Sequence, residues 1–189
     1  FGAHVALILR RLNRVLAHYG AEPVFVLSSA TVADPANSAE RLIDAPVAAV
    51  TEDAAPRARR TIAFWQPPIL AVDESVQVRR SAATEAAELL ADFVASDTRT
   101  LAFVRSRRGA EELTQQTRRL LAVSSPELAK RVSSYRGGYL PEERRAIEAS
   151  LRSGELMGLA TTNALELGID IAGLDAVITL GFPGTRAAL

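Results

Sequence analysis

Short apolar runs alternate with longer amphipathic stretches from residue 61 to residue 180, and this rhythm constrains the fold more than any other feature. Continuous apolar runs predict buried strands, and apolar residues spaced by three or four predict helices between them. Strands joined through helices form a parallel sheet by right-handed crossovers, with helices on both faces, so the predicted class is α/β. The predicted strands are residues 61–65, 100–104, 131–135, 156–160 and 176–180, and the predicted helices are 84–95, 107–121 and 141–152.

Capping residues mark the ends of several predicted helices. Ser106 stands where an N-cap is expected, since its side chain can accept from a free backbone N–H. Pro141 fits the first turn of a helix, and Gly154 fits the position just past its end. Asn163 and Glu166 have the spacing of a capping box, which predicts a short helical turn after residue 160.

The first 51 residues form a separate portion of the chain, followed by a linker. Residues 52–60 are polar, contain Pro56 and lack periodicity, which is typical of a connection between domains. The predicted divisions are therefore residues 1–51, 52–60 and 61–189. Within the first, we expect helices at 5–19 and 36–43 and strands at 23–27 and 47–51.

Composition excludes several classes of protein. The 22 basic and 22 acidic residues cancel, so bulk attraction to nucleic acid is not implied, although local patches can still bind it. With no cysteine and two histidines, disulfides and cysteine-ligated zinc are excluded, and no metal site is predicted. No apolar run reaches the roughly 18 residues of a membrane-spanning helix. Lys130 is the single lysine, so the other basic residues are arginines, whose planar guanidinium can grip phosphate in two places.

Motifs for self-contained catalysis are absent from the sequence. There is no Gly-x-Gly-x-x-Gly fingerprint, no Gly-Lys-Ser/Thr loop and no Gly-x-Ser-x-Gly elbow. The pair Asp73-Glu74 follows the apolar run 69–72 and imitates a Walker B strand. It lies close to Pro67-Pro68, however, and no Walker A loop precedes it. We therefore predict no complete catalytic site in this chain.

Candidate binding residues follow the predicted strands, because ligands of open α/β sheets bind at the carboxyl ends of the strands. The triplet Ser29-Ala30-Thr31 offers hydroxyls that can bond across to a nucleotide site or cap a helix. Arg105, Ser106 and Arg107 lie where a strand runs into a helix, and backbone N–H groups there favour an anion. A helix cap with surface arginines is the alternative.

Two further strand ends carry glycines and hydroxyls. In Tyr135-Arg136-Gly137-Gly138-Tyr139 the glycines allow a backbone to approach a phosphate or simply allow a turn, and a tyrosine can stack on a base or sugar. The last segment runs from the hydroxyls of Thr161 and Thr162 through Asn163 to Gly168 and Asp170. Its threonines can donate to a phosphate and its aspartate can accept from a ribose hydroxyl. A capped half-helix is the alternative.

The order and spacing of these segments resemble the superfamily 2 DNA and RNA helicases, whose cores contain RecA-like parallel sheets of the P-loop NTPase type. The sequence is similar to that of the RecQ-like bacterial helicases of the MrfA type, which are linked to DNA repair, at Phe1 to Val5, Leu27 to Pro35 and Trp65 to Pro68. The resemblance implies a truncated core: 1–51 as the last part of the first RecA-like domain and 61–189 as most of the second.

The resemblance also implies roles for the candidate residues. Ser29, Ala30 and Thr31 would couple ATP hydrolysis to strand movement, and Gly168 and Asp170 would lie near the nucleotide ribose. The implied nucleic-acid contacts are Arg105, Ser106, Arg107, Arg136, Gly137, Thr161, Thr162 and Asn163. The implied cofactors are ATP and Mg²⁺, and the implied partner is DNA, single-stranded or as a 3'-tailed duplex, with RNA as an alternative. We expect a cytoplasmic helicase with no membrane association.

The family's P-loop and Asp-Glu-x-His box would precede Phe1, and its arginine finger would follow Leu189. Because phosphoryl transfer needs the phosphate cradle, the metal ligand and that arginine together, we expect residues 1–189 alone not to hydrolyse ATP. A non-catalytic nucleic-acid-binding module and an RNA helicase remain alternatives to the DNA helicase.

Overall fold

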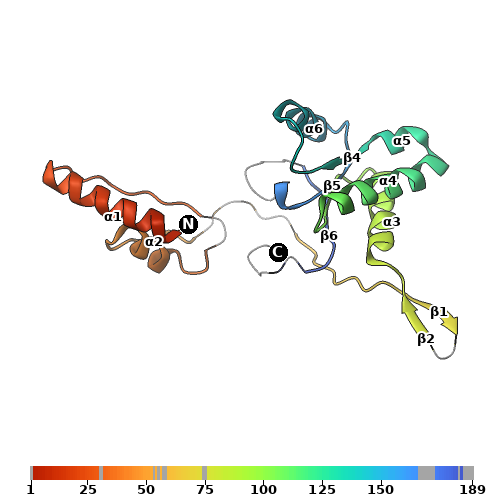
Figure 1. Cartoon of the computed structure of the whole chain (residues 1–189), viewed down its shortest axis with the longest axis horizontal. Helices are drawn as coiled ribbons and strands as arrows, with labels where there is room; N and C mark the ends of the chain where they lie inside the picture. The colour runs from red at the N-terminus through yellow and green to blue at the C-terminus, as the bar shows by residue number, and fades with distance from the viewer. Residues whose placement is uncertain are drawn as a thin grey trace. The chain divides into compact units, whose positions relative to one another are not determined.

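The computed structural model describes residues 2–29, 32–52, 54, 56, 59–73, 76–165, 173–182 and 184, with backbone only at 71–73, 76, 77 and 164. Contacts between Cα atoms divide the chain into two units, Phe1–Ile62 and Ala63–Leu189 (Figure 1). Each unit is described by itself.

The first unit contains two helices that pack on each other, α1 (Gly2–His18) and α2 (Pro35–Ile43). Both predicted helices are thus confirmed. The side chain of Asp34 caps α2 by accepting from the Asn37 N–H at 3.2 Å. The Asn13 amide ties the helices together by donating to the Ile43 carbonyl at 2.8 Å.

Three predicted strands are not formed. Residues 23–27, 47–51 and 61–65 have no strand pairing among the described residues. The side chains of Val24 and Val26 are 89% and 90% exposed, and Phe64 is 95% exposed. An isolated strand leaves its N–H and C=O groups unpaired, so an apolar run becomes a strand only beside another strand. These predictions were wrong because no neighbouring strand is available in the described parts of the chain.

The second unit is built on a four-stranded parallel sheet in the order β4-β5-β3-β6. The strands are β3 (Thr100–Phe103), β4 (Val132–Tyr135), β5 (Gly158–Thr161) and β6 (Ala176–Thr179). The four strands predicted between residues 100 and 180 are confirmed within two residues at each end. Their parallel pairing confirms the α/β class.

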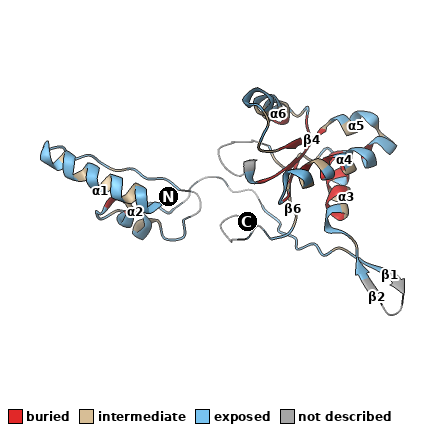
Figure 2. Cartoon of the chain, viewed as in Figure 1, coloured by how far each residue is buried: buried red, intermediate tan, exposed pale blue. Residues whose placement is uncertain are grey.

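Helices cover both faces of this sheet. On one face, α3 (Ala82–Ala95) and α4 (Arg107–Ser124) bury Ala102, Val132 and Ala160. On the other face, Leu151 of α6 (Pro141–Ser153) packs with Leu101 and Leu159. Successive strand residues alternate between the two clusters, as the period of two requires. Figure 2 shows the buried residues along α3 and the sheet.

The caps predicted for two of these helices are also confirmed. The Ser106 hydroxyl accepts from the Gly109 N–H at 2.9 Å at the start of α4. Pro141 opens α6, and Gly154 closes it in the left-handed conformation with φ of 80°. Asn163 begins the short 3₁₀ helix η1 (Asn163–Leu165), but Glu166, its predicted capping partner, lies outside the described residues.

Some elements were not predicted. The apolar run 69–72 lies in β1 (Ile69–Asp73), which pairs antiparallel with β2 (Val76–Arg79) and not with the four-stranded sheet. A short helix, α5 (Pro126–Lys130), follows α4 and is capped by Ser125.

A polar cluster attaches the segment before the β1–β2 hairpin to α3. The Trp65 indole donates to a Glu85 carboxylate oxygen at 3.0 Å, and Arg80 donates to the other oxygen at 3.3 Å. Arg80 also pairs with Glu88, and its backbone N–H donates to the Pro68 carbonyl at 2.9 Å. Glu85 is buried, and its charge is balanced by Arg80, as a buried carboxylate requires.

Across the described parts of both units, no helix combines the length and apolar character needed to cross a membrane. The same residues contain no cluster of three or more histidine, aspartate or glutamate side chains that could hold a metal ion.

Candidate nucleic-acid interface

The carboxyl ends of three strands bring predicted segments to one edge of the sheet. Phe103 of β3 and Tyr135 of β4 both lie level with Thr161 of β5 in the parallel register. The segments that follow these strands therefore leave the sheet on the same side. Three of the four predicted segments meet there: residues 105–107, 136–137 and 161–163.

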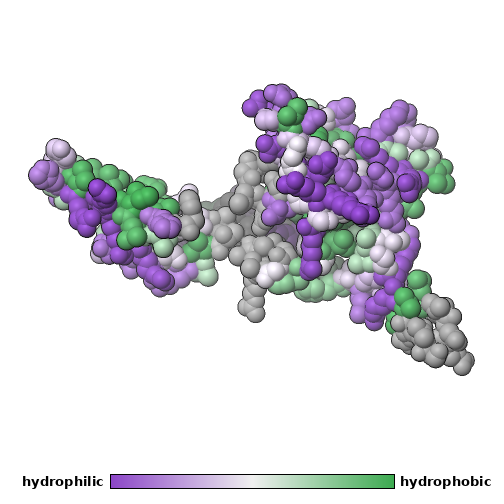
Figure 3. Space-filling model, viewed as in Figure 1, coloured by the Kyte–Doolittle hydropathy of each residue, from purple (hydrophilic) through white to green (hydrophobic). Residues whose placement is uncertain are grey.

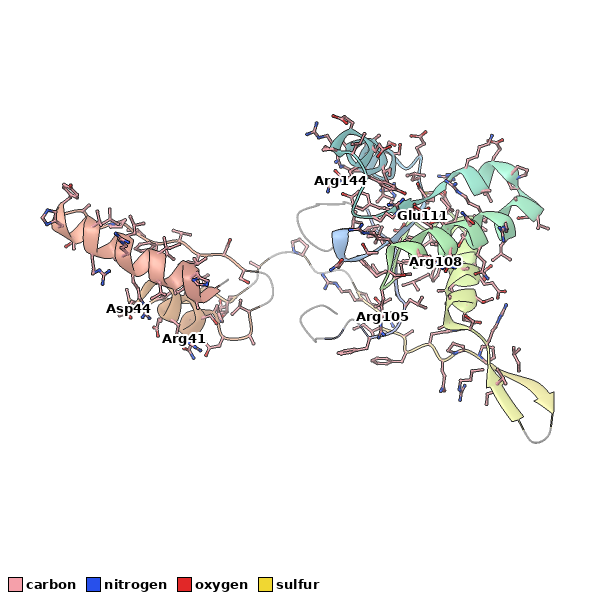
Figure 4. All side chains as sticks on the ribbon, viewed as in Figure 1. Arg41, Asp44, Arg105, Arg108, Glu111 and Arg144 are labelled. Carbon is pink, nitrogen blue, oxygen red and sulfur yellow. The ribbon has the colours of Figure 1, made fainter. Side chains whose placement is uncertain are left out.

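Arg105 and Ser106 form the corner between β3 and α4. The exposed Arg105 guanidinium reaches across to the segment after β6, where its Nη2 donates to the Phe182 carbonyl at 3.0 Å (Figure 4). The Ser106 hydroxyl caps α4 through its oxygen. Because a hydroxyl has one proton and two acceptor sites, Ser106 can still donate to an anion while it caps the helix.

Arg107 lies against the glycine turn that follows β4. A Cβ added at Gly137 would lie 3.2 Å from the Arg107 Nη2 atom, so any other residue there would push the guanidinium aside by a few tenths of an ångström. A Cβ at Gly138 would lie 3.8 Å from Arg107 Nη1 and 3.5 Å from Arg136 Nη1. Two guanidinium groups therefore flank one turn. Within the described residues, the Arg107 side chain makes no hydrogen bond or ion pair.

Arg136 is held by a carboxylate and a ring. Its Nε donates to Glu111 Oε1 at 2.7 Å, and its guanidinium lies 4.7 Å from the centre of the Tyr139 ring. The hydrogen bond from Arg136 lowers the pKa of Glu111 below its ordinary value, since it favours the ionised form, while partial burial opposes this shift. Glu111 is thus ionised at neutral pH.

Tyr135 anchors the start of this loop in the core. Its ring is buried on the α6 face of the sheet, and its hydroxyl donates to Glu148 of α6 at 2.8 Å. Burial raises the pKa of the Tyr135 hydroxyl, and the hydrogen bond to Glu148 adds to this effect. The residue before Arg136 is therefore fixed to the sheet.

The threonines after β5 are buried in this structure. Thr161 has no exposed surface, and its hydroxyl donates to the Thr162 carbonyl at 3.0 Å. Thr162 is also buried, at 7% exposure. Asn163 is exposed at the start of η1, so it is the member of this predicted group that presents its side chain to solvent.

The remaining predicted residues do not join this edge. Ser29 is exposed in the first unit, and its position relative to the sheet is not defined. Ala30, Thr31, Gly168 and Asp170 lie outside the described residues.

Sequence reasoning missed Glu111 as part of the interface. Its one sequence signal is its position four residues after Arg107 on a predicted helix, which places both on the same face. Tyr139 was considered as a stacking surface for a base or sugar. In the structure its ring supports Arg136, and its hydroxyl donates to Glu111 at 3.0 Å.

A parallel sheet between helices, with arginines gathered at the carboxyl edge of its strands, defines the second unit as a RecA-like domain of the kind found in helicases. Residues 84–189 match the family described as "Helicase conserved C-terminal domain". The chain belongs to this family of helicase domains.

Similar proteins extend the likeness to nearly the whole chain. It is 42% identical over 188 residues to "Uncharacterized ATP-dependent helicase YprA" of Bacillus subtilis, covering 100% of this chain and 25% of that protein. It is 38% identical over 186 residues to "ATP-dependent helicase hrq1" of Schizosaccharomyces pombe, covering 97% of this chain and 18% of that protein.

Among solved structures, "DUF1998 helicase MrfA bound to DNA" matches with a TM-score of 0.89 and 41% identity, covering 99% of this chain and 24% of that one. The predicted resemblance to superfamily 2 helicases of the MrfA type is confirmed. The chain spans about a quarter of the length of the Bacillus subtilis relative.

Proposed function

We propose that this chain is part of an ATP-dependent superfamily 2 DNA helicase and that the second unit grips the phosphate backbone of a single strand. The observation that carries the proposal is the meeting of Arg105, Arg107 and Arg136 at the carboxyl edge of one parallel sheet. Guanidinium groups bind phosphate through charge-assisted hydrogen bonds. The DNA-bound state of the MrfA structure supports DNA as the polymer.

This grip is independent of base sequence. Arg105 and Arg107 are exposed, and Ser106 retains a hydroxyl proton to donate, so all three suit phosphate oxygens rather than a particular base edge. Binding through phosphates releases counterions, so we expect affinity to fall steeply as salt is raised. In a motor, successive changes in such a grip move a strand and separate a duplex.

The residues present do not complete an ATP site. A phosphate cradle needs a Gly-Lys-Ser/Thr loop, and the chain's single lysine, Lys130, follows alanine and lies at the end of α5. The described residues also lack a cluster of metal-binding side chains that would suit Mg²⁺. We therefore propose that ATP and Mg²⁺ are held by parts of a longer protein and that residues 1–189 alone do not hydrolyse ATP. An ATPase assay with single-stranded DNA tests this: turnover above background would contradict it.

The finer proposals rest on the family resemblance. They assign residues 1–51 and 61–189 to the first and second RecA-like domains. They also assign a coupling role to residues 29–31, a phosphate contact to Thr161 and a nucleotide contact to Gly168 and Asp170. They also include a 3'-tailed or single-stranded DNA substrate, a role in DNA repair and a cytoplasmic location. Competition between single-stranded DNA and RNA for the protein tests the choice of polymer.

A single-residue comparison tests the grip itself. We expect Arg107→Ala to weaken binding of a fluorescein-labelled oligo(dT) about tenfold, which corresponds to about 1.4 kcal/mol. Arg108→Ala is the matched control, because Arg108 is the next residue and already pairs with Glu112 at 2.6 Å. We expect its effect to stay within about twofold, since an exposed charge that already pairs with a carboxylate contributes only through screened attraction. Equal losses in both variants, or no binding by the parent chain, would refute the proposed grip.

A further inference from the structure

Glu111 stands out because a carboxylate at a phosphate-binding edge looks unfavourable. It lies on α4 one turn after Arg107, and its side chain is 37% exposed. Figure 3 shows that hydrophilic residues cover much of the visible face of the second unit, and Figure 4 labels Glu111 between α4 and the loop after β4. A negative charge here should repel a polynucleotide, so its presence needs another explanation.

The contacts of Glu111 provide that explanation. Its Oε1 atom accepts from Arg136 Nε at 2.7 Å and from the Tyr139 hydroxyl at 3.0 Å. The Tyr139 oxygen lies 2.7 Å from the Ser134 hydroxyl. When Tyr139 donates to Glu111, Ser134 donates to Tyr139, so a chain of hydrogen bonds joins β4, the following loop and α4.

This arrangement leaves the outer part of the Arg136 guanidinium available. Glu111 occupies Nε, and the Tyr139 ring lies beside the guanidinium at 4.7 Å. Within the described residues, no carboxylate other than Glu111 pairs with Arg136. The Nη1 atoms of Arg136 and Arg107 both lie within 4 Å of the position that a Cβ would take at Gly138.

Two guanidinium groups this close repel each other unless a negative charge lies nearby. The Glu111 carboxylate supplies that charge from the side of Arg136 Nε. We infer that Glu111 is a positioning residue for phosphate binding: it holds Arg136 beside Arg107 over the glycine turn, so that the Nη atoms of both can bind one strand. The inference rests on the proposed function, and it assigns Tyr139 to the support of Arg136 rather than to base stacking.

Two readings of Glu111 predict opposite results. If its carboxylate only repels DNA, its removal strengthens binding. If it positions Arg136, removal weakens binding, even though the protein becomes more positive. Glu112→Ala is a matched control, because it removes the same charge from the neighbouring residue of the same helix without touching Arg136.

The experiment measures fluorescence anisotropy of labelled oligo(dT) longer than about 16 nucleotides, enough to fill a binding site. It uses the 189-residue chain between about 50 and 200 mM salt. We expect Glu111→Ala to weaken binding about fivefold, as for the loss of one ordinary hydrogen bond. Glu111→Gln keeps an oxygen that accepts from Arg136 Nε, so we expect it to bind more tightly than Glu111→Ala. Glu112→Ala should bind as well as the parent chain or better.

A double variant separates positioning from a general structural effect. In an Arg136→Ala background the carboxylate has no arginine to position, so Glu111→Ala should no longer weaken binding and should instead strengthen it. A loss of affinity that persists in this background would overturn the inference, as would equal or tighter binding by Glu111→Ala alone. Circular dichroism establishes that the compared variants are folded.

The controls distinguish this inference from the proposed function. If the parent chain binds and Arg107→Ala binds weakly, but Glu111→Ala binds like the parent, the grip stands and the positioning role is refuted. If the parent chain does not bind, or Arg107→Ala binds like it, the grip is refuted and the positioning role falls with it.

Discussion

Gly158 offers the sharpest test of how the sheet is packed. A Cβ added there would lie 2.9 Å from Val94 Cγ2, 3.1 Å from Val132 Cγ2 and 3.4 Å from Leu90 Cδ1. All three neighbours are fully buried, at 0% exposure. Valine has few χ1 rotamers, so these side chains cannot easily turn away.

The expected cost of Gly158→Ala follows from these distances. Overpacking a core by one methyl group costs about 1–3 kcal/mol. Replacing glycine also lowers the entropy of the unfolded chain, which returns about 0.4–1 kcal/mol. We therefore expect the free energy of unfolding of the second unit to fall by about 1–2 kcal/mol, measured by urea denaturation followed by circular dichroism.

A second substitution checks the reason for the loss. Val94→Ala removes the methyl group closest to the new Cβ, so its cost and that of Gly158→Ala should not add in the double variant. Gly2→Ala is a control with open space around its Cβ. Unchanged or higher stability of Gly158→Ala, or strict additivity with Val94→Ala, would refute the packing described here.

Other substitutions test the caps, the buried carboxylate and the interface. Ser106→Ala removes the acceptor for the Gly109 N–H and should lower the free energy of unfolding by about 1 kcal/mol in urea denaturation. Glu85→Ala leaves the Trp65 indole and Arg80 without this buried partner, so limited proteolysis should cut residues 63–68 faster than in the parent. The pKa of Glu111 is lowered in the fold, so its stabilising contribution is complete above the ordinary value of 4.5 and is lost as pH falls below it. Glu111→Gln should therefore reduce the dependence of stability on pH in that acidic range, and an unchanged acid profile would contradict the ion pair.

Local patterns predicted the second unit well because they depend on neighbours in the chain. The helix after Ser106 and the helix between Pro141 and Gly154 carry both periodic apolar residues and end signals. The failures have a different origin. Residues 23–27 and 61–65 have the composition of strands, but pairing depends on a partner that composition does not specify. The hairpin at residues 69–79 was not predicted, because the apolar run 69–72 was compared only with a Walker B strand, and it pairs antiparallel with residues 76–79.

The sequence predicted which segments lie at the carboxyl edge of the sheet, but not the hydrogen bonds that their side chains make there. Strand ends in a parallel sheet converge by topology, so residues 105–107 and 136–137 could be placed together from the sequence. The bond between Glu111 and Arg136 joins residues 25 positions apart, and no local pattern announces it. Likewise, the bond from the Thr161 hydroxyl to the Thr162 carbonyl depends on how the chain turns after β5.

The hydrogen bond between the Trp65 indole and Glu85 also makes Trp65 an intrinsic fluorescence probe. Trp65 is the single tryptophan in the sequence, so emission excited at the red edge of indole absorption arises from one site. That site lies where the extended segment first attaches to α3. Changes in its spectrum therefore report attachment or release at this point without any added dye.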